Sequence, residues 1–209
     1  MSSFPYAPAT ERNKGPILEV LQTEFRDAHQ VLEIGSGTGE HAVFFGSNLP
    51  HLTWQTSDLI ENHPVILETL KREGNPSVKP PLTLDVEHDQ PPSIAADAVF
   101  SANTAHIMRI QAVQRMFELV ARVLYAGGVF CLYGPFNFED RFSSDSNARF
   151  DASLRQRDSS MGIRGLDDLD RFAGNAGLTR VRLYAMPANN HLAVWQKSQD
   201  AEPDRDDRC

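Results

Sequence analysis

One stretch decides the fold of this chain: Val31-Leu32-Glu33-Ile34-Gly35-Ser36-Gly37-Thr38-Gly39-Glu40-His41. A short apolar run leads into three glycines at alternate positions, and a helix-compatible segment, residues 42–45, follows. The pattern predicts a buried strand, a tight turn and the start of a helix. Glycine adopts positive φ and has no Cβ, so a ligand can lie against such a turn. A helix N-terminus beyond it would offer free N–H groups, and we therefore expect a nucleotide-type binding loop.

The composition is typical of one globular domain. The chain has 209 residues, of which 41% are hydrophobic and 23% charged, which suits a domain with a sizeable core. The formal net charge of -8 argues against a nucleic-acid partner, because binding a phosphate backbone depends on Lys and Arg patches. No apolar run approaches the roughly 20 residues of a membrane span, and the N-terminus lacks the features of a signal peptide. We expect a cytoplasmic protein with no membrane partner.

The cysteines and histidines predict no metal site. Cys131 lies in an apolar run, where we expect a buried thiol, and Cys209 is the last residue. The two cysteines form no disulfide framework. The histidines show neither the i, i+4 spacing nor the nearby cysteine pairs of zinc sites.

Strands and helices are predicted to alternate along the chain, from hydrophobic spacing and from Pro and Gly signals. This alternation implies an α/β fold, a mostly parallel sheet with helices on both faces, and a C-terminal antiparallel hairpin. The pair Gly127-Gly128 is expected to end a helix. Predicted helices cover residues 16–25, 62–73, 111–124 and 167–176, and predicted strands cover residues 31–34, 52–59, 82–86, 97–103, 129–135, 179–186 and 191–196.

Three segments fall outside this alternation in a single domain of residues 1–197. Residues 1–15 end in a dense polar cluster that is either a solvated turn or an N-terminal flap over the nucleotide site. Residues 136–164 are polar and weakly periodic, and we expect a long loop or lid that packs on the body. Residues 198–209 hold five acids and two arginines, which predicts a disordered acidic tail.

Acidic residues at two strand ends narrow the choice of ligand. Asp58 and Asp85 lie at the ends of the second and third predicted strands, and in open sheets ligands lie at the carboxyl ends of the strands. Asp58 suits the two hydroxyls of a ribose, and Asp85 suits the exocyclic amine of an adenine. Glu40 stands where a dinucleotide fingerprint has its third glycine, and an acid there would repel a pyrophosphate. A ligand with an adenosine end and an amino-acid end fits better.

These features resemble class I S-adenosylmethionine-dependent methyltransferases. The resemblance covers about residues 15–197 and is carried by the loop of residues 33–39, by Asp58-Leu59, by Asp85-Val86 and by Gly127-Gly128. It implies a Rossmann-like fold with a seven-stranded sheet, and S-adenosyl-L-methionine as cofactor. The match looks closer to the methyltransferase-like protein 26 family and its bacterial relatives, because of residues 9–18, 101–107 and 150–155.

The resemblance also implies which residues contact the cofactor. The loop would line the methionine moiety, Asp58 would hold the ribose, Leu59 would lie against the adenine, and Asp85 with Val86 would reach the adenine edge. Asn103 would present a backbone or amide group to the ligand. The implied cofactor-binding set is Glu33, Gly35, Ser36, Gly37, Thr38, Gly39, Asp58, Leu59, Asp85, Val86 and Asn103.

The residues that would serve the methyl acceptor are less strongly marked. Residues 101–106 lack the Asp/Asn-Pro-Pro-aromatic motif of nucleobase and glutamine amino-group methyltransferases, which makes those acceptors less favoured. His106, just past a strand end, is the candidate general base, although local packing is an alternative. Asn103 and Tyr133 would also face the acceptor, or in the case of Tyr133 the core. A polar lid that suits a small, anionic acceptor would comprise Arg12, Asn13, Arg149, Asp151 and Arg155, unless these only form a solvated surface.

The sequence therefore predicts an enzyme that transfers a methyl group from S-adenosyl-L-methionine to a small molecule by in-line displacement, with proximity and desolvation as the main effects. Two alternatives stay open. One is an NAD-type oxidoreductase on a similar sheet, which Glu40 disfavours. The other is a methyltransferase-like protein that binds the cofactor without turnover.

Overall fold

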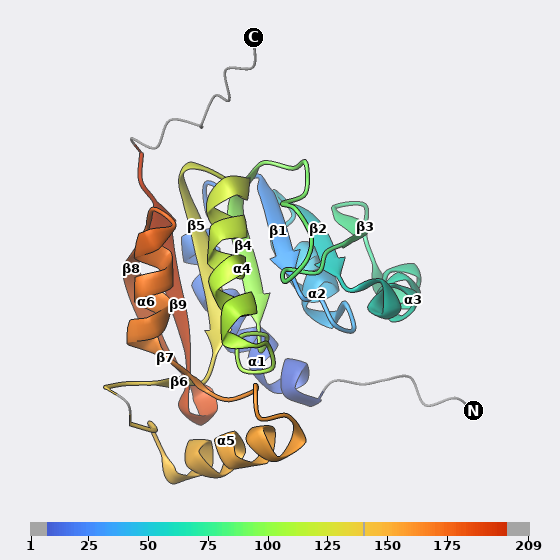
Figure 1. Ribbon diagram of the computed structural model, residues 1–209. Helices are drawn as coiled ribbons and strands as arrows, with labels where there is room; N and C mark the ends of the chain where they lie inside the picture. The colour runs from blue at the N-terminus through green and yellow to red at the C-terminus, as the bar shows by residue number, and fades with distance from the viewer. Residues whose placement is uncertain (1–7, 140, 200–209) are drawn as a thin grey trace, which may run out of the picture.

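The computed structural model describes residues 8–139 and 141–199 and shows one sheet between two helical layers (Figure 1). Two short 3-10 helices, Ile60–Asn62 and Pro187–Asn189, complete the regular structure. The elements in chain order are α1 (Pro8–Glu24), β1 (Gln30–Ile34), α2 (Glu40–Asn48), β2 (Thr53–Asp58), α3 (His63–Glu73), β3 (Val78–Thr83), β4 (Ala96–Ala102), α4 (Ile110–Val123), β5 (Leu124–Gly134), β6 (Phe136–Asn137), α5 (Asp145–Arg157), β7 (Arg164–Gly165), α6 (Leu166–Asn175), β8 (Leu178–Met186) and β9 (Asn190–Lys197).

The sheet has seven strands in the order β3-β2-β1-β4-β5-β9-β8. Neighbouring strands are parallel from β3 to β5, whereas β9 is antiparallel to both β5 and β8. The predicted α/β fold with its C-terminal antiparallel hairpin is confirmed. Strand order reverses between β1 and β4, and this switch point is where parallel sheets bind ligands.

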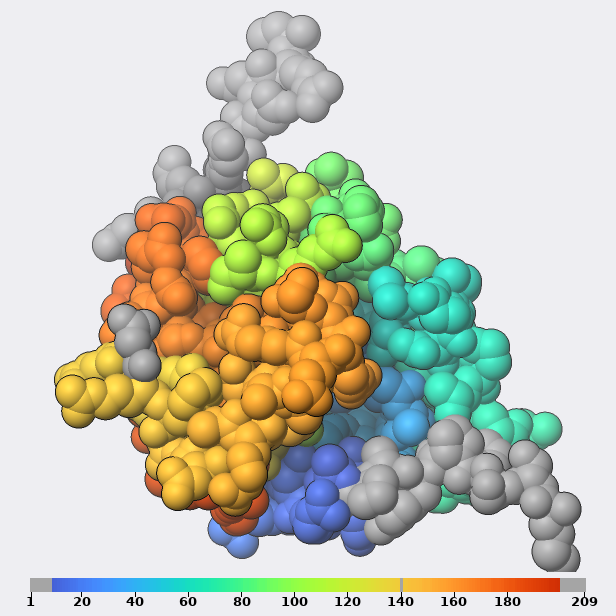
Figure 2. Space-filling model, turned by 60° about the horizontal axis from the view of Figure 1, so that its bottom comes forward, coloured from blue at the N-terminus to red at the C-terminus, as the bar shows by residue number. Residues whose placement is uncertain are grey.

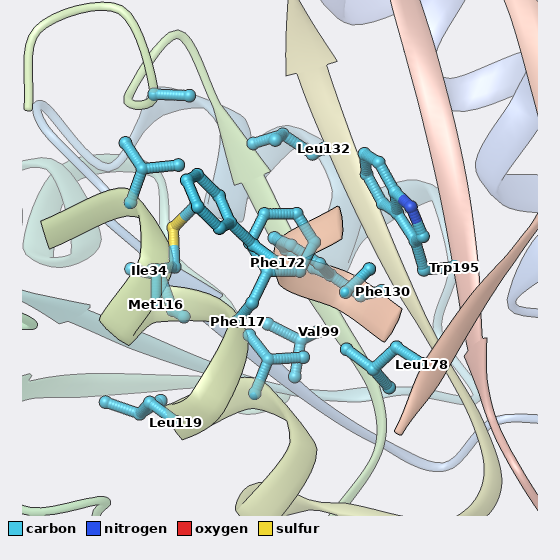
Figure 3. Packing of buried hydrophobic residues seen from close by; sticks show 14 of the residues in the cluster. Ile34, Val99, Met116, Phe117, Leu119, Phe130, Leu132, Phe172, Leu178 and Trp195 are labelled. Carbon is cyan, nitrogen blue, oxygen red and sulfur yellow. The ribbon is translucent and has the colours of Figure 1, made fainter. Parts of the chain in front are cut away.

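Each face of the sheet has its own hydrophobic core. On one face, α4 and α6 pack through Phe117 and Phe172 against Trp195 and Phe130 of the sheet (Figure 3). On the other face, α1 and α2 bury Leu21 and Phe45 among other side chains, with Cys131 fully buried as predicted. Burial of large apolar side chains on both faces fixes the strand ends in space.

Helix α1 begins at Pro8 and not at Pro16, so the predicted start of the first helix was wrong. Pro16 lies inside the helix, where a missing N–H normally disfavours it. Tertiary contacts outweigh that local signal, because Thr10 and Asn13 in the first turns are buried. Residues 8–15 of the predicted flap are therefore helical, and residues 1–7 lie outside the described part of the chain.

Two strand boundaries also differ from the prediction. Strand β3 spans Val78–Thr83 in place of 82–86, and it tolerates Pro80-Pro81 because it is an edge strand. Strand β5 begins at Leu124, directly after α4, so Gly127 and Gly128 lie within the strand and do not end the helix. A Cβ at Gly128 would lie 2.8 Å from the carbonyl oxygen of Asp97, which explains a glycine there.

The predicted long loop of residues 136–164 holds helix α5 and strand β6, and β6 forms a separate two-stranded sheet with β7. Sequence periodicity missed α5 because its inward side is largely polar: its fully buried residues are Asn147, Asp151 and Leu154. Ser144 caps the helix by accepting a hydrogen bond from the backbone N–H of Asn147 at 3.2 Å. Of the predicted acidic tail, residues 200–209 lie outside the described residues.

Among the described residues, no helix is both long and apolar enough to cross a bilayer. Within the same residues, no three His, Cys, Asp or Glu side chains gather in an arrangement that would hold a metal ion.

Candidate ligand-binding cleft

A cleft of about 520 Å³ lies at the carboxyl ends of β1, β2 and β4. Figure 2 views this end of the molecule, and the surface is hollowed between the segment after α5, in orange, and the region of α3, in teal. The cleft is lined by Ile34, Gly35, Gly37, Asp58, Leu59, Asn62, Leu84, Asp85, Val86, Glu87, Ala102, Asn103, Thr104, Ile107, Met108, Arg109, Ala112, Asp158 and Ser160.

The glycine turn forms one end of the cleft. Gly35, Gly37 and Gly39 have φ of 73°, 58° and 79°, a left-handed conformation that side chains disfavour. A Cβ at Gly35 would also lie 2.6 Å from the Thr104 side chain. The turn is held by the Ser57 carbonyl, which accepts from the backbone N–H groups of Gly35 and Ser36, each at 3.0 Å. The predicted strand, turn and helix start are confirmed.

Behind the turn, Glu33 is buried and does not line the cleft. Its Oε2 accepts hydrogen bonds from Ser36 Oγ at 2.8 Å and Trp54 Nε1 at 3.1 Å. Burial raises the pKa of Glu33 to about 7 against the effect of these bonds. Two residues of the predicted cofactor set, Glu33 and Ser36, thus form a buried network that supports the turn. Thr38 and Gly39 also lie outside the cleft lining.

Asp58 lies at the end of β2, as predicted, and is already hydrogen-bonded to the loop. Its Oδ2 accepts from the Gly37 N–H at 2.6 Å, and its Oδ1 accepts from the Leu59 N–H and the Asn62 side-chain amide, both at 2.7 Å. An ionised carboxylate has about four acceptor positions, so most are occupied. Leu59 is exposed by 37% and offers an apolar surface next to this carboxylate.

Asp85 lines the cleft from a turn that follows β3. Its carboxylate accepts from the Glu87 N–H at 2.8 Å and pairs with His88 Nδ1 at 2.9 Å. The hydrogen bond with His88 lowers the pKa of Asp85. The neighbouring Val86 is buried and lines the same wall, so both residues of the predicted pair lie in the cleft.

Asn103 is a non-glycine residue with a positive φ of 61°. It follows β4, lines the cleft, and donates its backbone N–H to the Tyr133 carbonyl at 2.9 Å. Asparagine tolerates this left-handed conformation better than most other residues, and non-glycine residues that adopt it gather at functional sites. Thr104 beside it shares a 2.7 Å hydrogen bond between hydroxyls with Ser101, which helps to hold the strand end.

His106 lies behind the cleft wall and is 7% exposed. The ring of Phe150 meets its imidazole edge-on, with centroids 5.3 Å apart. Burial lowers the pKa of His106 to about 4, and the charge of Arg164 acts in the same direction. At neutral pH the imidazole is therefore uncharged, and Phe150 of α5 packs against it.

Tyr133 and Asn13 are brought together, but in a buried cluster and not in the cleft. Asn13 Oδ1 lies 2.8 Å from His41 Nε2, and its side chain also hydrogen-bonds to Tyr133. Burial raises the pKa of Tyr133 and lowers that of His41 to about 4. The sequence did not mark His41 as part of a cluster, since its partners lie far away along the chain.

The residues of the predicted polar lid do not gather on one surface, because helix α5 directs those that it carries to different sides. Asp151 is buried and accepts hydrogen bonds from the Ile163 N–H and from Arg155 Nε, both at 2.7 Å. Arg149 is exposed, and because residues two apart on a helix differ by about 200°, it lies on the side away from Asp151 and the body. Arg12 is exposed on α1.

Charged residues that the sequence did not single out complete the cleft. Arg109 forms an ion pair with Glu87 at 3.8 Å, and Asp158 with Ser160 lines the wall that the segment after α5 contributes. They reach the cleft only through the folding of α5 and of the β4–α4 loop. No local motif could have indicated them.

Solved structures with a similar fold include methyltransferases. An O-methyltransferase family protein from Burkholderia thailandensis matches with a TM-score of 0.79 and 18% identity, over 90% of this chain and 57% of that one. The mitomycin 7-O-methyltransferase MmcR matches with a TM-score of 0.79 and 16% identity, over 91% and 54%. PigF with SAH matches with a TM-score of 0.72 and 18% identity, over 87% and 61%.

The chain thus spans little more than half the length of these structures. At such identities the likeness concerns the fold, and it confirms the predicted Rossmann-like class I methyltransferase fold. A family match over residues 4–197 covers nearly the whole chain, and the protein belongs to the family described as "Protein of unknown function (DUF938)".

Proposed function

We propose that this protein binds S-adenosyl-L-methionine in the cleft and transfers its methyl group to a small-molecule acceptor. One observation carries the proposal: a turn of three left-handed glycines meets the carboxylate of Asp58 through the 2.6 Å bond from Gly37, at the switch point of the sheet. The methyltransferase neighbours support it, since PigF was solved with SAH and an O-methyltransferase family 2 protein from Planctomyces limnophilus was solved in complex with apigenin. The closer relation to the methyltransferase-like protein 26 family stays part of the proposal.

The residues of the cleft fit this cofactor in shape and charge. The glycine turn leaves room for an amino-acid end, Asp58 suits ribose hydroxyls, and Leu59 with Val86 and Ile107 suits an adenine face. Among the described residues, the carboxylates of Asp58, Asp85, Glu87 and Asp158 line the cleft, and Arg109 contributes one guanidinium. Such a wall favours a cation. When bound, the cofactor supplies an electrophilic methyl group on a positively charged sulfur.

The side chains of this protein would mainly align the reactants and exclude water. Asn103, held in a left-handed conformation at the strand end, would orient a ligand group with its amide. His106 is neutral at pH 7 and so is able to accept a proton at a ring nitrogen, provided that α5 shifts to uncover it. We keep it as the candidate base, with local packing as the alternative.

The acceptor is proposed to be a small molecule. An anionic acceptor was expected from the arginines of the lid, but Arg155 is paired with Asp151 and Arg149 lies on the outward side of α5. Support for a carboxylate on the acceptor therefore rests on Arg12. A cytoplasmic location and the absence of nucleic-acid, membrane and metal partners stay predictions.

Calorimetric titration with S-adenosylhomocysteine and with NAD tests the cofactor, using wild type, Asp58→Asn and the control Asp27→Asn. Asp27 is an exposed acid at the opposite end of the sheet, in another cavity. We expect wild type and Asp27→Asn to bind S-adenosylhomocysteine alike, and Asp58→Asn to bind it about tenfold or more weakly, because hydrogen bonds to a charged group are lost. Binding of NAD alone would overturn the proposal in favour of an oxidoreductase.

Turnover is tested by incubating the protein and labelled S-adenosyl-L-methionine with a metabolite extract. Label should enter a small molecule, and His106→Gln should reduce the rate while cofactor affinity is kept. Tight cofactor binding without any labelled product would favour the non-catalytic alternative. An unchanged rate in His106→Gln would remove this histidine from the mechanism.

A further inference from the structure

Arg164 is a buried cation close to the cleft that no sequence motif marked. It is the first residue of β7 and is 8% exposed. Its guanidinium donates from Nε to the Ala105 carbonyl at 3.0 Å, and from Nη2 to the carbonyls of Ser160, at 2.9 Å, and Met108. Three backbone carbonyls from two distant segments thus meet on one side chain.

Both of these segments form walls of the cleft. Ala105 and Met108 belong to the β4–α4 loop, whose residues Thr104, Ile107 and Met108 line the cleft. Ser160 belongs to the α5–β7 segment and lines it from the other side. One backbone hydrogen bond, from Gly162 N–H to the His106 carbonyl at 2.9 Å, joins the same two segments. The hydrogen bonds of Arg164 and Gly162 therefore fix the distance between the two walls of the cleft.

The α5–β7 segment is itself held firmly against α5. Asp151 accepts from the Ile163 N–H at 2.7 Å and pairs with Arg155. A Cβ at Gly162 would lie 2.6 Å from the Arg155 guanidinium and 2.9 Å from the Asp151 carboxylate. Any movement of α5 is consequently transmitted to Ser160 and, through Arg164, to the loop beside the ligand.

An arginine suits this position better than any other residue. Its planar guanidinium presents donors in a rigid fork that reaches several carbonyls at once, whereas lysine offers a compact charge on a flexible stem. A buried charge is costly unless it is well hydrogen-bonded. The two nearby carboxylates, of Asp151 and Asp168, compensate part of the charge at a distance.

We propose that Arg164 is a positioning residue of the cleft: it holds the β4–α4 loop and the α5–β7 segment in one arrangement and so sets ligand affinity without contacting the ligand. The identity of that ligand rests on the proposed function. A merely structural role would lower the stability of the fold, but it would leave the affinity of the folded protein unchanged.

Two measurements on Arg164→Lys, at a temperature where the variant is fully folded, separate these roles. Hydrogen exchange of the ligand-free protein should rise together in residues 104–109 and 158–162, since both walls lose their common anchor. The dissociation constant for S-adenosylhomocysteine should rise about tenfold. Arg180→Lys is the matched control, because Arg180 pairs with Asp170 at 2.9 Å away from the cleft, and neither quantity should change.

A chemical rescue experiment tests Arg164→Ala, which loses the whole guanidinium. Arg164→Ala with added ethylguanidinium should regain part of its affinity for S-adenosylhomocysteine, whereas sodium chloride at equal ionic strength should not restore it. Unchanged exchange in either wall, or wild-type affinity in Arg164→Lys, would overturn the inference. If wild type does not bind S-adenosylhomocysteine, the proposed function fails. The hydrogen-exchange measurement on the ligand-free protein then tests by itself whether Arg164 holds the two walls together.

Discussion

Glu33 is a buried acid whose protonation is linked to folding. Burial raises its pKa from 4.5 in the unfolded chain to about 7 in the folded protein. The folded state therefore binds this proton more tightly. The resulting stabilisation is complete below pH 4.5 and is lost as the pH rises to about 7. Because the carboxylate supports the glycine turn through Ser36, the turn is built on a group that titrates near neutrality.

We predict that Glu33→Gln removes this pH dependence. The amide oxygen of glutamine can still accept from Ser36 and Trp54, but it cannot ionise. The free energy of unfolding of wild type relative to Glu33→Gln should fall by about 1–3 kcal/mol between pH 4.5 and pH 7. Urea unfolding across this range measures it, with the exposed Glu68→Gln as control. A difference that is constant with pH would contradict the assignment.

Asn13 connects three elements at a single side chain. It lies on α1 and bridges His41 at the start of α2 and Tyr133 at the end of β5. Asn13→Ala would leave both partners buried and unsatisfied, so we expect a loss of about 1–3 kcal/mol in the free energy of unfolding. Asn48→Ala removes an exposed hydrogen bond to the Phe44 carbonyl and should cost less. Equal losses in both variants would contradict a buried bridge.

At the level of elements, helix α5 is joined to the end of the β8–β9 hairpin. The Asn147 amide donates to the Asn189 carbonyl at 3.1 Å. That turn places two residues, Ala188 and Asn189, in the left-handed region, each with φ of 58°. Asparagine tolerates this conformation, whereas alanine does so at a cost. The turn therefore stores strain at one residue.

We predict that Ala188→Gly stabilises the protein by about 0.5–1 kcal/mol, because relief of the left-handed strain exceeds the added flexibility of the unfolded chain. Ala152→Gly, at an exposed position of α5, should destabilise it by about 1 kcal/mol. Thermal or urea unfolding of both variants gives the comparison. Destabilisation by Ala188→Gly would mean that the turn adopts another conformation.

Most of the sheet could be predicted, because its strands bury apolar residues in short runs. Strand β3 was predicted too late in the chain, because Pro80 and Pro81 are typical of a loop, although an edge strand accepts them. Helix α5 was missed because it buries Asn147 and Asp151 in place of an apolar stripe. Propensity and periodicity describe neither of these situations, since each depends on neighbours that are distant along the chain.

For the whole molecule, the cleft could be predicted in part. Gly35 and Gly37 belong to one local motif and Asp58 ends the following strand, and parallel strands bring their ends together. Arg109 and Asp158, by contrast, enter the cleft from segments whose place depends on the complete fold. Local sequence could locate the end of the cleft that the glycine turn forms, but not the wall opposite to it.

The acidic character of the cleft leads to a prediction about ionic strength. Four carboxylates face one guanidinium there, and the protein as a whole carries a formal charge of -8. S-adenosyl-L-methionine has a positive sulfur that S-adenosylhomocysteine lacks. Raising the salt from about 0.01 M to about 1 M should therefore weaken binding of the former by about three- to tenfold more than that of the latter. Parallel calorimetric titrations measure this, and equal salt dependence would contradict it.

The two consecutive prolines of β3 also bear on self-association. Successive residues of a strand direct their backbone N–H groups to opposite sides, so one proline faces β2 and the other faces the open edge. Toward β2, the pairing is irregular between Gln55 and Ser57. Toward solvent, a second chain that added itself as an eighth strand would find a position without a donor. The residue pair that disturbs the register inside the sheet thus also protects this edge against aggregation.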